Sequence, residues 1–341
     1  MNNDQKPSLQ EWKELYTAAL EFKELAPWDW MHDCDIFGVK NPENGEIGYC
    51  CIMGAAGEHY ALGLYLGSEG LMGITKILSG EFSNFKDEAF FLQKCLMASF
   101  EDRKYLNKQD LAQIKTLDLK FRGSNAWPMF RNHTPGFVPW YLDSAQARFL
   151  TIALQQAIDV SKRFRKDKSL LEYPSNAHYF VRVPRKMGED IVWQDEWLVP
   201  LPAEKEALPV VHVDETILSR LKKAKSTRKG TWEIDFFYMP AVISEKGERP
   251  CYPFMSLIVD HDSAFIFNFQ IEKRDMVLTN FPAKFIEFLE KTKFMPGRIL
   301  VKRDEIRRIL EPLAAKLGIE LRSVESLPAM EYAQRSMRGF I

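Results

Sequence analysis

The first third of the chain carries one helical pattern of apolar residues, followed by short runs of strand-forming residues. Five apolar residues share one helix face: Trp12, Leu15, Tyr16, Ala19 and Phe22. Ser8 and Glu11 form a capping box before them, so the pattern predicts a helix that ends near Leu25. Strand-like runs follow at Asp35–Val39, Ile47–Met53 and Tyr60–Leu66, the first two separated by the turn-rich residues 41–45. One helix on an antiparallel sheet is expected.

A second helical pattern runs from about Ser144 to Phe164 and is expected to close the first domain near residue 170. Residues 171–229 contain five prolines, two short strand-like runs around Phe180 and Val192–Val199, and a helical pattern near Asp214–Lys223. We interpret this stretch as a connector with some structure of its own. The basic residues near its end, from Lys222 to Lys229, are typical of a solvated linker.

The last part of the chain, residues 230–341, has the clearest order of elements. Strands are predicted at Trp232–Met239, Phe254–Val259, Ala264–Ile271, Arg298–Val301 and Ile319–Val324. Helices are predicted at Pro282–Lys291, Asp304–Leu317 and Ala329–Arg338, the second ended by Gly318. The order β-β-β-α-β-α-β-α implies a mixed sheet with helices on its faces. The whole chain is therefore expected to be of the α+β or α/β class, with domains at 1–170 and 230–341 and the connector between them.

Composition places the chain among globular proteins with ordinary cores. Of the 341 residues, 46% are apolar and 27% are charged, and 46 Lys and Arg against 47 Asp and Glu give a net charge of −1. This balance gives no support for a nucleic-acid partner, so any charge-driven binding must be local. The polar start lacks the pattern of a secretory signal, and Glu58 and His59 interrupt the longest apolar stretch. With five sparse cysteines, these features predict a cytoplasmic protein without a membrane segment.

The best candidate for a binding surface is a Pro-rich segment with several aromatic residues. It contains Trp127, Arg131, His133 and Trp140, and we expect it to form an ordered loop. Aromatic faces and a guanidinium there can grip a ligand or a partner's side chain. The alternative, which we favour, is that the rings pin a long connection onto the domain.

The same segment carries a resemblance to a known family. Trp127-Pro128-Met129-Phe130-Arg131 and Pro135-Gly136-Phe137-Val138-Pro139-Trp140, with Pro27-Trp28 and the strings Leu317-Gly318-Ile319 and Leu327-Pro328, are similar to a family of uncharacterised bacterial proteins with two tandem domains of unknown function. The resemblance covers most of the chain. It implies no activity, substrate or partner.

The order of the C-terminal elements resembles the ribonuclease H and integrase group. That resemblance implies carboxylates that hold two metal ions, and the matching residues are Asp235, Asp304 and Glu331. Each of the last two also suits a helix start, Asp304 as an N-cap and Glu331 through the helix dipole. A neutral domain is moreover unlike a nuclease, which carries a basic groove.

The remaining candidate groups have simple structural interpretations. His32, Cys34, Cys50, Cys51 and His59 lack metal-ligand spacing, and their cysteines are read as core thiols, with no metal or cofactor expected. Gly67-Ser68-Glu69-Gly70 is read as a tight turn, and Asp260-His261-Asp262 as a hairpin turn. Because no catalytic constellation is complete, the predicted function is a non-catalytic binding or interaction protein with a possible protein partner. The alternative is a metal-dependent nuclease that uses Asp235, Asp304 and Glu331.

Overall fold

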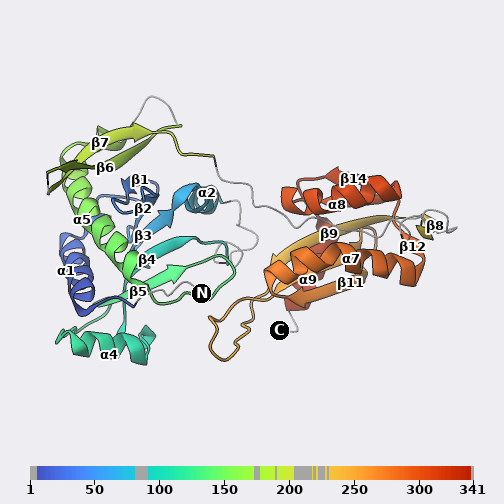
Figure 1. The fold of residues 1–341 in the computed structure, drawn as a ribbon, viewed down its shortest axis with the longest axis horizontal. Coiled ribbons are helices and arrows are strands. Elements are labelled where there is room, and N and C mark those ends of the chain that lie inside the picture. Colours follow the sequence, from blue (N-terminus) through green and yellow to red (C-terminus); the bar gives the residue numbers. More distant parts are fainter. Residues whose placement is uncertain are drawn as a thin grey trace. The chain divides into compact units, whose positions relative to one another are not determined.

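The computed structural model describes residues 6–80, 91–172, 177–188, 190–202, 217, 220–221, 227–228 and 230–338. Its contacts divide the chain into two units, Met1–Glu204 and Lys205–Ile341 (Figure 1). The boundaries predicted at residues 170 and 230 stay predictions, and most of the predicted helix at 214–223 lies outside the described residues. The α+β fold class expected from the sequence is confirmed: each unit is a mixed sheet covered by helices.

A seven-stranded sheet forms the centre of the first unit, in the order β5-β4-β3-β2-β1-β6-β7. Its strands are β1 Phe37–Lys40, β2 Ile47–Met53, β3 Tyr60–Leu66, β4 Cys95–Glu101, β5 Trp127–His133, β6 Tyr179–Met187 and β7 Asp190–Leu198. All neighbours are antiparallel except β1 and β6. The two strand-like runs that we placed in the connector are thus β6 and β7, and they extend the sheet of the first unit.

Helices lie on both faces of this sheet (Figure 1). They are α1 Leu9–Leu25, α2 Gly67–Leu78, α4 Lys108–Thr116 and α5 Ser144–Lys166, with short 3₁₀ turns at Pro27–Asp29, Arg103–Tyr105 and Lys168–Leu171. The predicted capping box of α1 is present, since Ser8 Oγ accepts from the Glu11 amide and the Glu11 carboxylate accepts from the Ser8 amide. Helices α1 and α5 cover the main core, and α2 covers a smaller one on the opposite face.

The predicted tight turn at Gly67–Gly70 is wrong in extent. Gly67 makes the sharp bend with a φ of +60°, but it is already the first residue of α2, and the next three residues continue that helix. The reason is close packing behind the helix: a Cβ on Gly70 would lie 2.7 Å from the Tyr65 carbonyl carbon and 2.8 Å from the Lys94 carbonyl oxygen. Gly67 therefore allows the sharp bend out of β3, and Gly70 allows the first turn of α2 to pack closely against the sheet.

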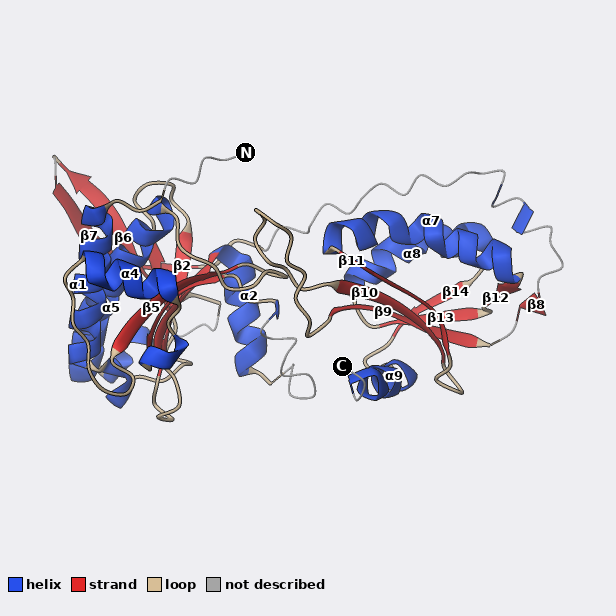
Figure 2. Ribbon diagram, turned by 90° about the horizontal axis from the view of Figure 1, so that it is seen from below, coloured by secondary structure: helices blue, strands red, loops and turns tan. Residues whose placement is uncertain are grey.

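The second unit holds a five-stranded sheet in the order β11-β10-β9-β13-β14, with α7 and α8 on one face and α9 on the other (Figure 2). Its strands are β9 Thr231–Tyr238, β10 Phe254–Asp260, β11 Ile266–Glu272, β13 Arg298–Val301 and β14 Glu320–Ser323, and a small sheet pairs β8 Thr227–Arg228 with β12 Phe294–Met295. Its helices are α7 Arg274–Thr292, α8 Asp304–Leu317 and α9 Pro328–Arg338. Strand β13 runs parallel to both β9 and β14, so the sheet is mixed as predicted.

Alternate residues of β9 serve the two faces of this sheet. Trp232 and Phe236 are buried among the aromatic rings of α7, with Phe236 and Phe281 ring centroids 4.7 Å apart. Glu233 and Asp235 belong to the opposite face, where α9 packs on β9 and β10. The predicted hairpin turn between β10 and β11 is confirmed, because Asp260 Oδ2 accepts from the Ser263 amide at 2.9 Å and from its hydroxyl at 2.7 Å.

Candidate functional site

The segment that contains the predicted binding residues is an edge strand followed by a turn, so the expectation of a loop at residues 127–133 is wrong. These residues form β5, which pairs with β4 from Cys95 opposite His133 to Glu101 opposite Trp127. Pro128 had argued for a loop, but an edge strand tolerates proline because one side of it has no strand to donate to. Beyond β5 the chain folds back, and Asn132 and Trp140 exchange backbone hydrogen bonds of 2.8 and 3.0 Å.

Arg131 is tied into the unit by a bidentate ion pair. Its Nη1 and Nη2 donate to the two carboxylate oxygens of Asp110 at 2.9 and 2.6 Å, and Nη1 also donates to the Phe130 carbonyl at 2.8 Å. The side chains of Arg131 and Asp110 are only 12% and 9% exposed. The guanidinium lies 5.1 Å from the ring centroid of Tyr141. The charge of Arg131 is therefore used to join β5 to α4 and to hold the turn that follows β5.

The aromatic residues of this region differ in exposure. Trp127 is half-buried against the main core. Its ring centroid lies 5.6 Å from that of Phe121 and 5.8 Å from the guanidinium carbon of Arg103. Trp140 is 39% exposed and contacts only the edge of Tyr141 among the ring contacts of the described residues. Phe137, which sequence reasoning did not single out, is 42% exposed. His133 ends β5 and is half-buried. The outer surface of the turn is therefore aromatic.

The segment that contains α4, which the Arg131–Asp110 pair joins to β5, carries a local positive charge. Residues 102–131 contain seven Lys and Arg against three Asp and Glu, a net charge of +4 in a chain whose total is −1. Of the three acidic residues, Asp110 forms the ion pair with Arg131, and Asp102 Oδ2 lies 3.9 Å from Lys104 Nζ. Five exposed cations make no ion pair within the described residues: Arg103, Lys108, Lys115, Lys120 and Arg122. The field near α4 thus favours an anionic group.

Asp110 is the residue at this site that the sequence reasoning missed. It belongs to the capping box of α4, in which Asn107 Oδ1 accepts from the Gln109 and Asp110 amides and Asp110 accepts from the Asn107 amide. That spacing was a readable signal for a helix start. Its pairing with Arg131, 21 positions later, required the tertiary fold. Burial raises the pKa of Tyr16 beside this pair, with Asp110 adding to the rise and Arg131 opposing it.

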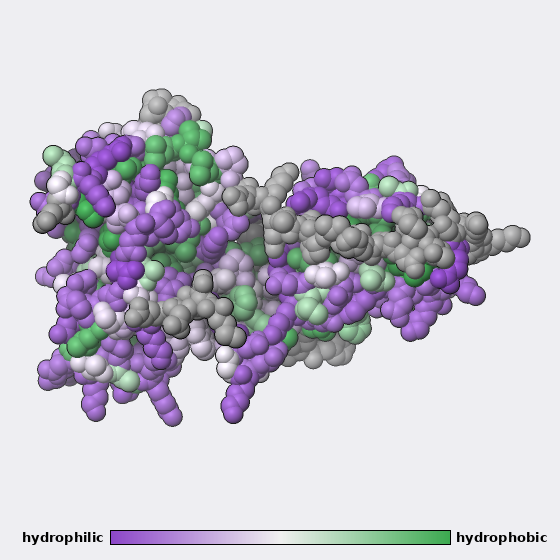
Figure 3. Space-filling model, viewed as in Figure 1, coloured by the Kyte–Doolittle hydropathy of each residue, from purple (hydrophilic) through white to green (hydrophobic). Residues whose placement is uncertain are grey.

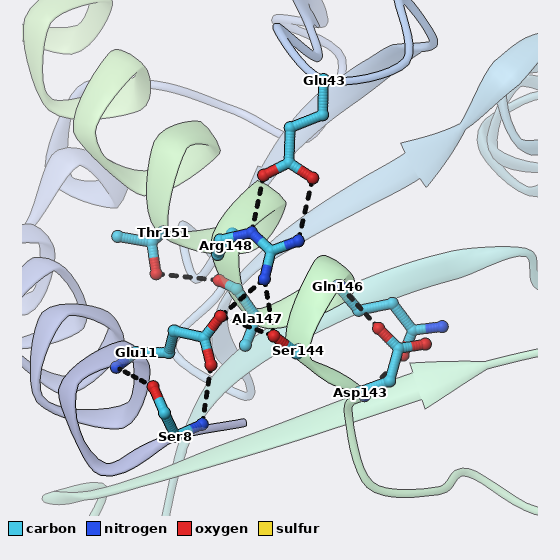
Figure 4. Close-up of polar contacts among 9 residues, drawn as sticks. All are labelled: Ser8, Glu11, Glu43, Asp143, Ser144, Gln146, Ala147, Arg148 and Thr151. Carbon is cyan, nitrogen blue, oxygen red and sulfur yellow. Dashed lines mark hydrogen bonds and ion pairs between the residues drawn. The ribbon is translucent and has the colours of Figure 1, made fainter. Parts of the chain in front are cut away.

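A second polar cluster of the first unit joins α1, α5 and the β1–β2 turn (Figure 4). Arg148 donates to both oxygens of Glu43 at 2.6 and 2.9 Å, and its Nη1 donates to Glu11 and to Ser144 Oγ, each at 2.6 Å. Ser144 Oγ in turn donates to Glu11 at 2.5 Å. Burial tends to raise the pKa of Glu11, but hydrogen bonds from Ser144, Ser8 and Arg148 outweigh it and lower the pKa to about 2. A carboxylate held this firmly in its charged form is a structural clamp rather than a general base.

Two of the three carboxylates of the nuclease alternative are paired with arginines in the second unit. Asp235 accepts from Arg303 Nε at 2.9 Å, and Asp304 accepts from Arg307 Nε at 3.1 Å. Glu331 lies in the first turn of α9, as predicted, but Asp304 is the first residue of α8 and not its N-cap, which is Arg303. Within the described part of the chain, no three His, Cys, Asp or Glu side chains gather as a metal site.

Glu233, two residues from Asp235, is the buried carboxylate that sequence reasoning missed. It is fully buried, and its two oxygens hold the Met330 amide at 2.7 Å and His261 Nδ1 at 2.6 Å. Glu233 lies between Trp232 and Ile234 in an apolar strand, and this position could have indicated a buried carboxylate. In the structure it anchors the start of α9 to the sheet.

The predicted core thiols are placed on different faces of the first sheet. Cys50 belongs to the core under α1 and α5, whereas Cys51 belongs to the core under α2, where its thiol donates to the Asp33 carbonyl at 3.2 Å. Adjacent strand residues point to opposite faces, so the two thiols do not share a site. All five cysteines are free and four are buried, whereas Cys34 is exposed, so the prediction of a core thiol is wrong at Cys34. Burial raises the pKa of Cys50, Cys51 and Cys95, which makes them unreactive.

Family models account for both units. Residues 12–182 match the model of a domain of unknown function, DUF7309, which spans α1 to the middle of β6. The chain belongs to the DUF7309 family. Residues 217–338 match a second domain of unknown function, DUF6930, so the tandem arrangement expected from the sequence is confirmed.

The comparisons assign no chemistry to this DUF7309 protein. The search of curated proteins finds no match to the chain. Neither family description mentions ribonuclease H or integrase, so that resemblance stays a prediction. No helix among the described residues has the length and apolar character needed to cross a membrane.

Proposed function

We propose that this DUF7309 protein is a non-catalytic binding protein of the bacterial cytoplasm, which holds an acidic segment of a protein partner against β5 and α4. Two observations carry the proposal: Trp140 and Phe137 are exposed in the turn after β5, and residues 102–131, which the Arg131–Asp110 pair joins to that region, have a net charge of +4. Exposed aromatic residues next to unpaired cations are typical of the anchors and the rim of a protein interface. The free cysteines agree with a reducing compartment.

The predicted binding residues take different parts in this proposal. Trp140 contacts the partner, since it is the most exposed of the four. Arg131 and Trp127 support it, because Arg131 fixes Tyr141 and α4, and Trp127 anchors the start of β5. His133 stands beside Asn132, whose backbone holds Trp140. A rigid support of this kind lowers the entropy cost of binding at the exposed ring.

The chemistry of the surface favours an acidic polypeptide over a nucleic acid. Binding of a single strand relies on bases that stack on free aromatic faces. Trp127 is half-buried and already contacts Phe121 and Arg103, so this tryptophan offers no open face on which a base could stack. The exposed cations also surround one short helix, and the chain as a whole is slightly acidic.

Fluorescence anisotropy with two labelled probes tests the proposal. The probes are a short Glu-rich peptide that carries two leucines and a single-stranded DNA of the same net charge. We expect the peptide to bind the full chain, and we expect Trp140→Ala and the double variant Lys108→Glu/Lys115→Glu each to weaken binding at least about tenfold. Tyr332→Ala changes an aromatic residue of the second unit that is more exposed than Trp140; it is the control and should leave binding unchanged.

Two outcomes would overturn this function. If the peptide binds Trp140→Ala and the parent protein equally well, the aromatic turn is not the binding surface. If the DNA binds more tightly than the peptide and its binding is lost in the same charge-reversal variant, the partner is a nucleic acid.

A further inference from the structure

Strand β11 is one edge of the second unit's sheet and carries exposed apolar residues. Strand β11 ends the order β11-β10-β9-β13-β14, and its far side pairs with no strand of the described chain. Phe269 is 55% exposed and Ile271 is 42% exposed. A hydrophobic edge of this kind is a template for pairing with another chain, and natural proteins usually protect such edges with charges or bulges.

The two faces of β11 have different characters over its last five residues. Phe269 and Ile271 stand opposite Leu257 and Met255 of β10, which belong to the apolar core under α9. Asn268, Gln270 and Glu272 alternate with them and belong to the face that α7 covers, where Glu272 pairs with Lys284. An irregularity in the β10 pairing, between Ile258 and Val259, separates this regular stretch from the start of β11.

From this pattern we infer that β11 pairs with β11 of a second copy of the chain, antiparallel and centred on Gln270. In that register Phe269 of each copy faces Ile271 of the other, so the exposed apolar residues cover each other. Asn268 faces Glu272, an amide donor opposite a carboxylate, and Gln270 faces its own counterpart. A closed two-fold pair requires a strand that complements itself in this way.

Two polar groups of the isolated edge fit this pairing. The Phe269 amide donates to the side chain of the preceding Asn268 at 2.9 Å, so the edge is capped by its own neighbour in place of a strand. The Gln270 Oε1 atom is buried and has no hydrogen-bond partner among the described residues. In the pair, the Phe269 amide donates to the Ile271 carbonyl of the other copy, and the opposing Gln270 supplies an amide donor.

The charges at the two ends of β11 agree with an antiparallel arrangement. The turn before β11 carries Asp260 and Asp262, and the residues after it are Lys273 and Arg274. Antiparallel pairing places the acidic end of one copy beside the basic end of the other, whereas a parallel arrangement places like charges together. Lys273 and Arg274 also hold Glu248 and Glu305 within their own chain, so this attraction orients the copies rather than anchors them.

Sedimentation velocity of the full chain over a range of concentrations tests the inference. We expect a dimer, and we expect Phe269→Lys and Ile271→Lys each to raise its dissociation constant at least about tenfold, because symmetry places every substitution in the interface twice. Tyr105→Lys changes an exposed aromatic residue of the first unit and is the matched control. Circular dichroism checks that the variants fold, as their exposed positions predict.

A cysteine at the centre of the strand tests the register. In a background with Cys34→Ser, Gln270→Cys should form an intermolecular disulfide on mild oxidation, since a directly opposed, non-hydrogen-bonded pair has Cα atoms about 4.5 Å apart. Asn268→Cys is the matched control, because its two copies would be offset by four residues, about 14 Å along the strands at roughly 3.4 Å per residue.

A chain that stays monomeric at all concentrations, or a dimer unaffected by Phe269→Lys, would overturn the inference. Faster cross-linking through position 268 than through 270 would overturn the register. The proposed binding surface at Trp140 belongs to the other unit, and its test does not depend on these results.

Discussion

At the scale of single residues, the first unit is held by charged groups whose partners are distant in sequence. Glu11 of α1 meets Ser144 and Arg148 of α5, and Arg131 of β5 meets Asp110 of α4. The contacts are short and partly or largely shielded from water. Removal of one partner leaves the other charge shielded from water and unpaired, so we expect these residues to be sensitive to single substitutions.

Glu11 should make the stability of the first unit depend on acid pH. Its pKa in the folded protein is lowered to about 2, below the 4.5 of a free Glu, so the charged form stabilises the fold above pH 4.5. This contribution is lost as the pH falls from about 4.5 towards 2. We expect Glu11→Gln to be less stable than the parent at pH 7, with the difference shrinking in this window. Urea unfolding at several pH values measures it.

Glu24→Gln is the matched control for this prediction, since Glu24 is an exposed residue of the same helix with no partner in the described structure. Because Glu24 makes no such contacts, its substitution should change the free energy of unfolding at pH 7 by less than about 0.5 kcal/mol. A Glu11→Gln variant that keeps the same stability difference from pH 7 to pH 3 would contradict the role assigned to the charge.

Arg131 should be necessary for stability as half of a buried pair. Arg131→Met leaves the Asp110 carboxylate buried without its cation, and we expect a loss of about 3–5 kcal/mol in the free energy of unfolding. Asp110→Asn added to Arg131→Met removes the stranded charge and keeps a side chain able to accept from the Asn107 amide, so it should recover part of the loss. Thermal melts of the two variants decide this, and a single variant that melts like the parent would exclude the buried-pair account.

At the scale of elements, the position of α2 depends on close packing of its first turn against the sheet. Gly70 is buried against β3 and the Lys94 carbonyl, whereas the nearest atom to a Cβ on Gly73, one turn later, would be 3.8 Å away. We expect Gly70→Ala to destabilise the first unit by about 1–3 kcal/mol through overpacking. Gly73→Ala should instead stabilise it by up to about 1 kcal/mol, through helix propensity.

Chemical denaturation of these two variants provides the comparison. The same substitution is made twice in one helix, so only the space around each Cβ differs. If both variants gain stability, the contact with the Lys94 carbonyl does not limit the position of α2.

Two separable units describe the molecule at the largest scale. Early proteolytic cuts are expected between Ala203 and Gly230, outside most of the described residues. Trp232 is fully buried in the second unit among the rings of Phe267, Phe285 and Phe294. We therefore expect Trp232→Ala to lower the stability of that unit by about 3–5 kcal/mol and to leave the first unit unchanged.

Hydrogen exchange read by mass spectrometry reports the two units separately in one experiment. Faster exchange in 231–301 with unchanged exchange in 9–166 is the expected result. A shift of equal size in both units would show that they unfold together and would contradict the predicted division.

Local patterns in the sequence determined most of the elements of this protein. Ser8 and Glu11 placed the start of α1, Gly318 placed the end of α8, and the runs at Ile47–Met53 and Tyr60–Leu66 are strands with those bounds. These signals are readable because capping, left-handed glycine and alternation of side chains act over a few residues. The helical pattern of Pro282–Lys291 was read too short because Pro282 suggested a start, whereas it lies inside α7.

Only the tertiary structure decided what the elements do together. The sequence does not show that β6 and β7 join the first sheet or that residues 127–133 form its opposite edge. It also does not show that Arg131 forms an ion pair with Asp110. Nor does it show that Asp235 is held by Arg303 while Glu233 anchors α9. Each of these pairings joins residues that are at least 20 positions apart or strands with intervening helices. Such contacts form because the chain buries its apolar faces cooperatively. A local sequence pattern therefore does not specify which distant residue or strand becomes the partner.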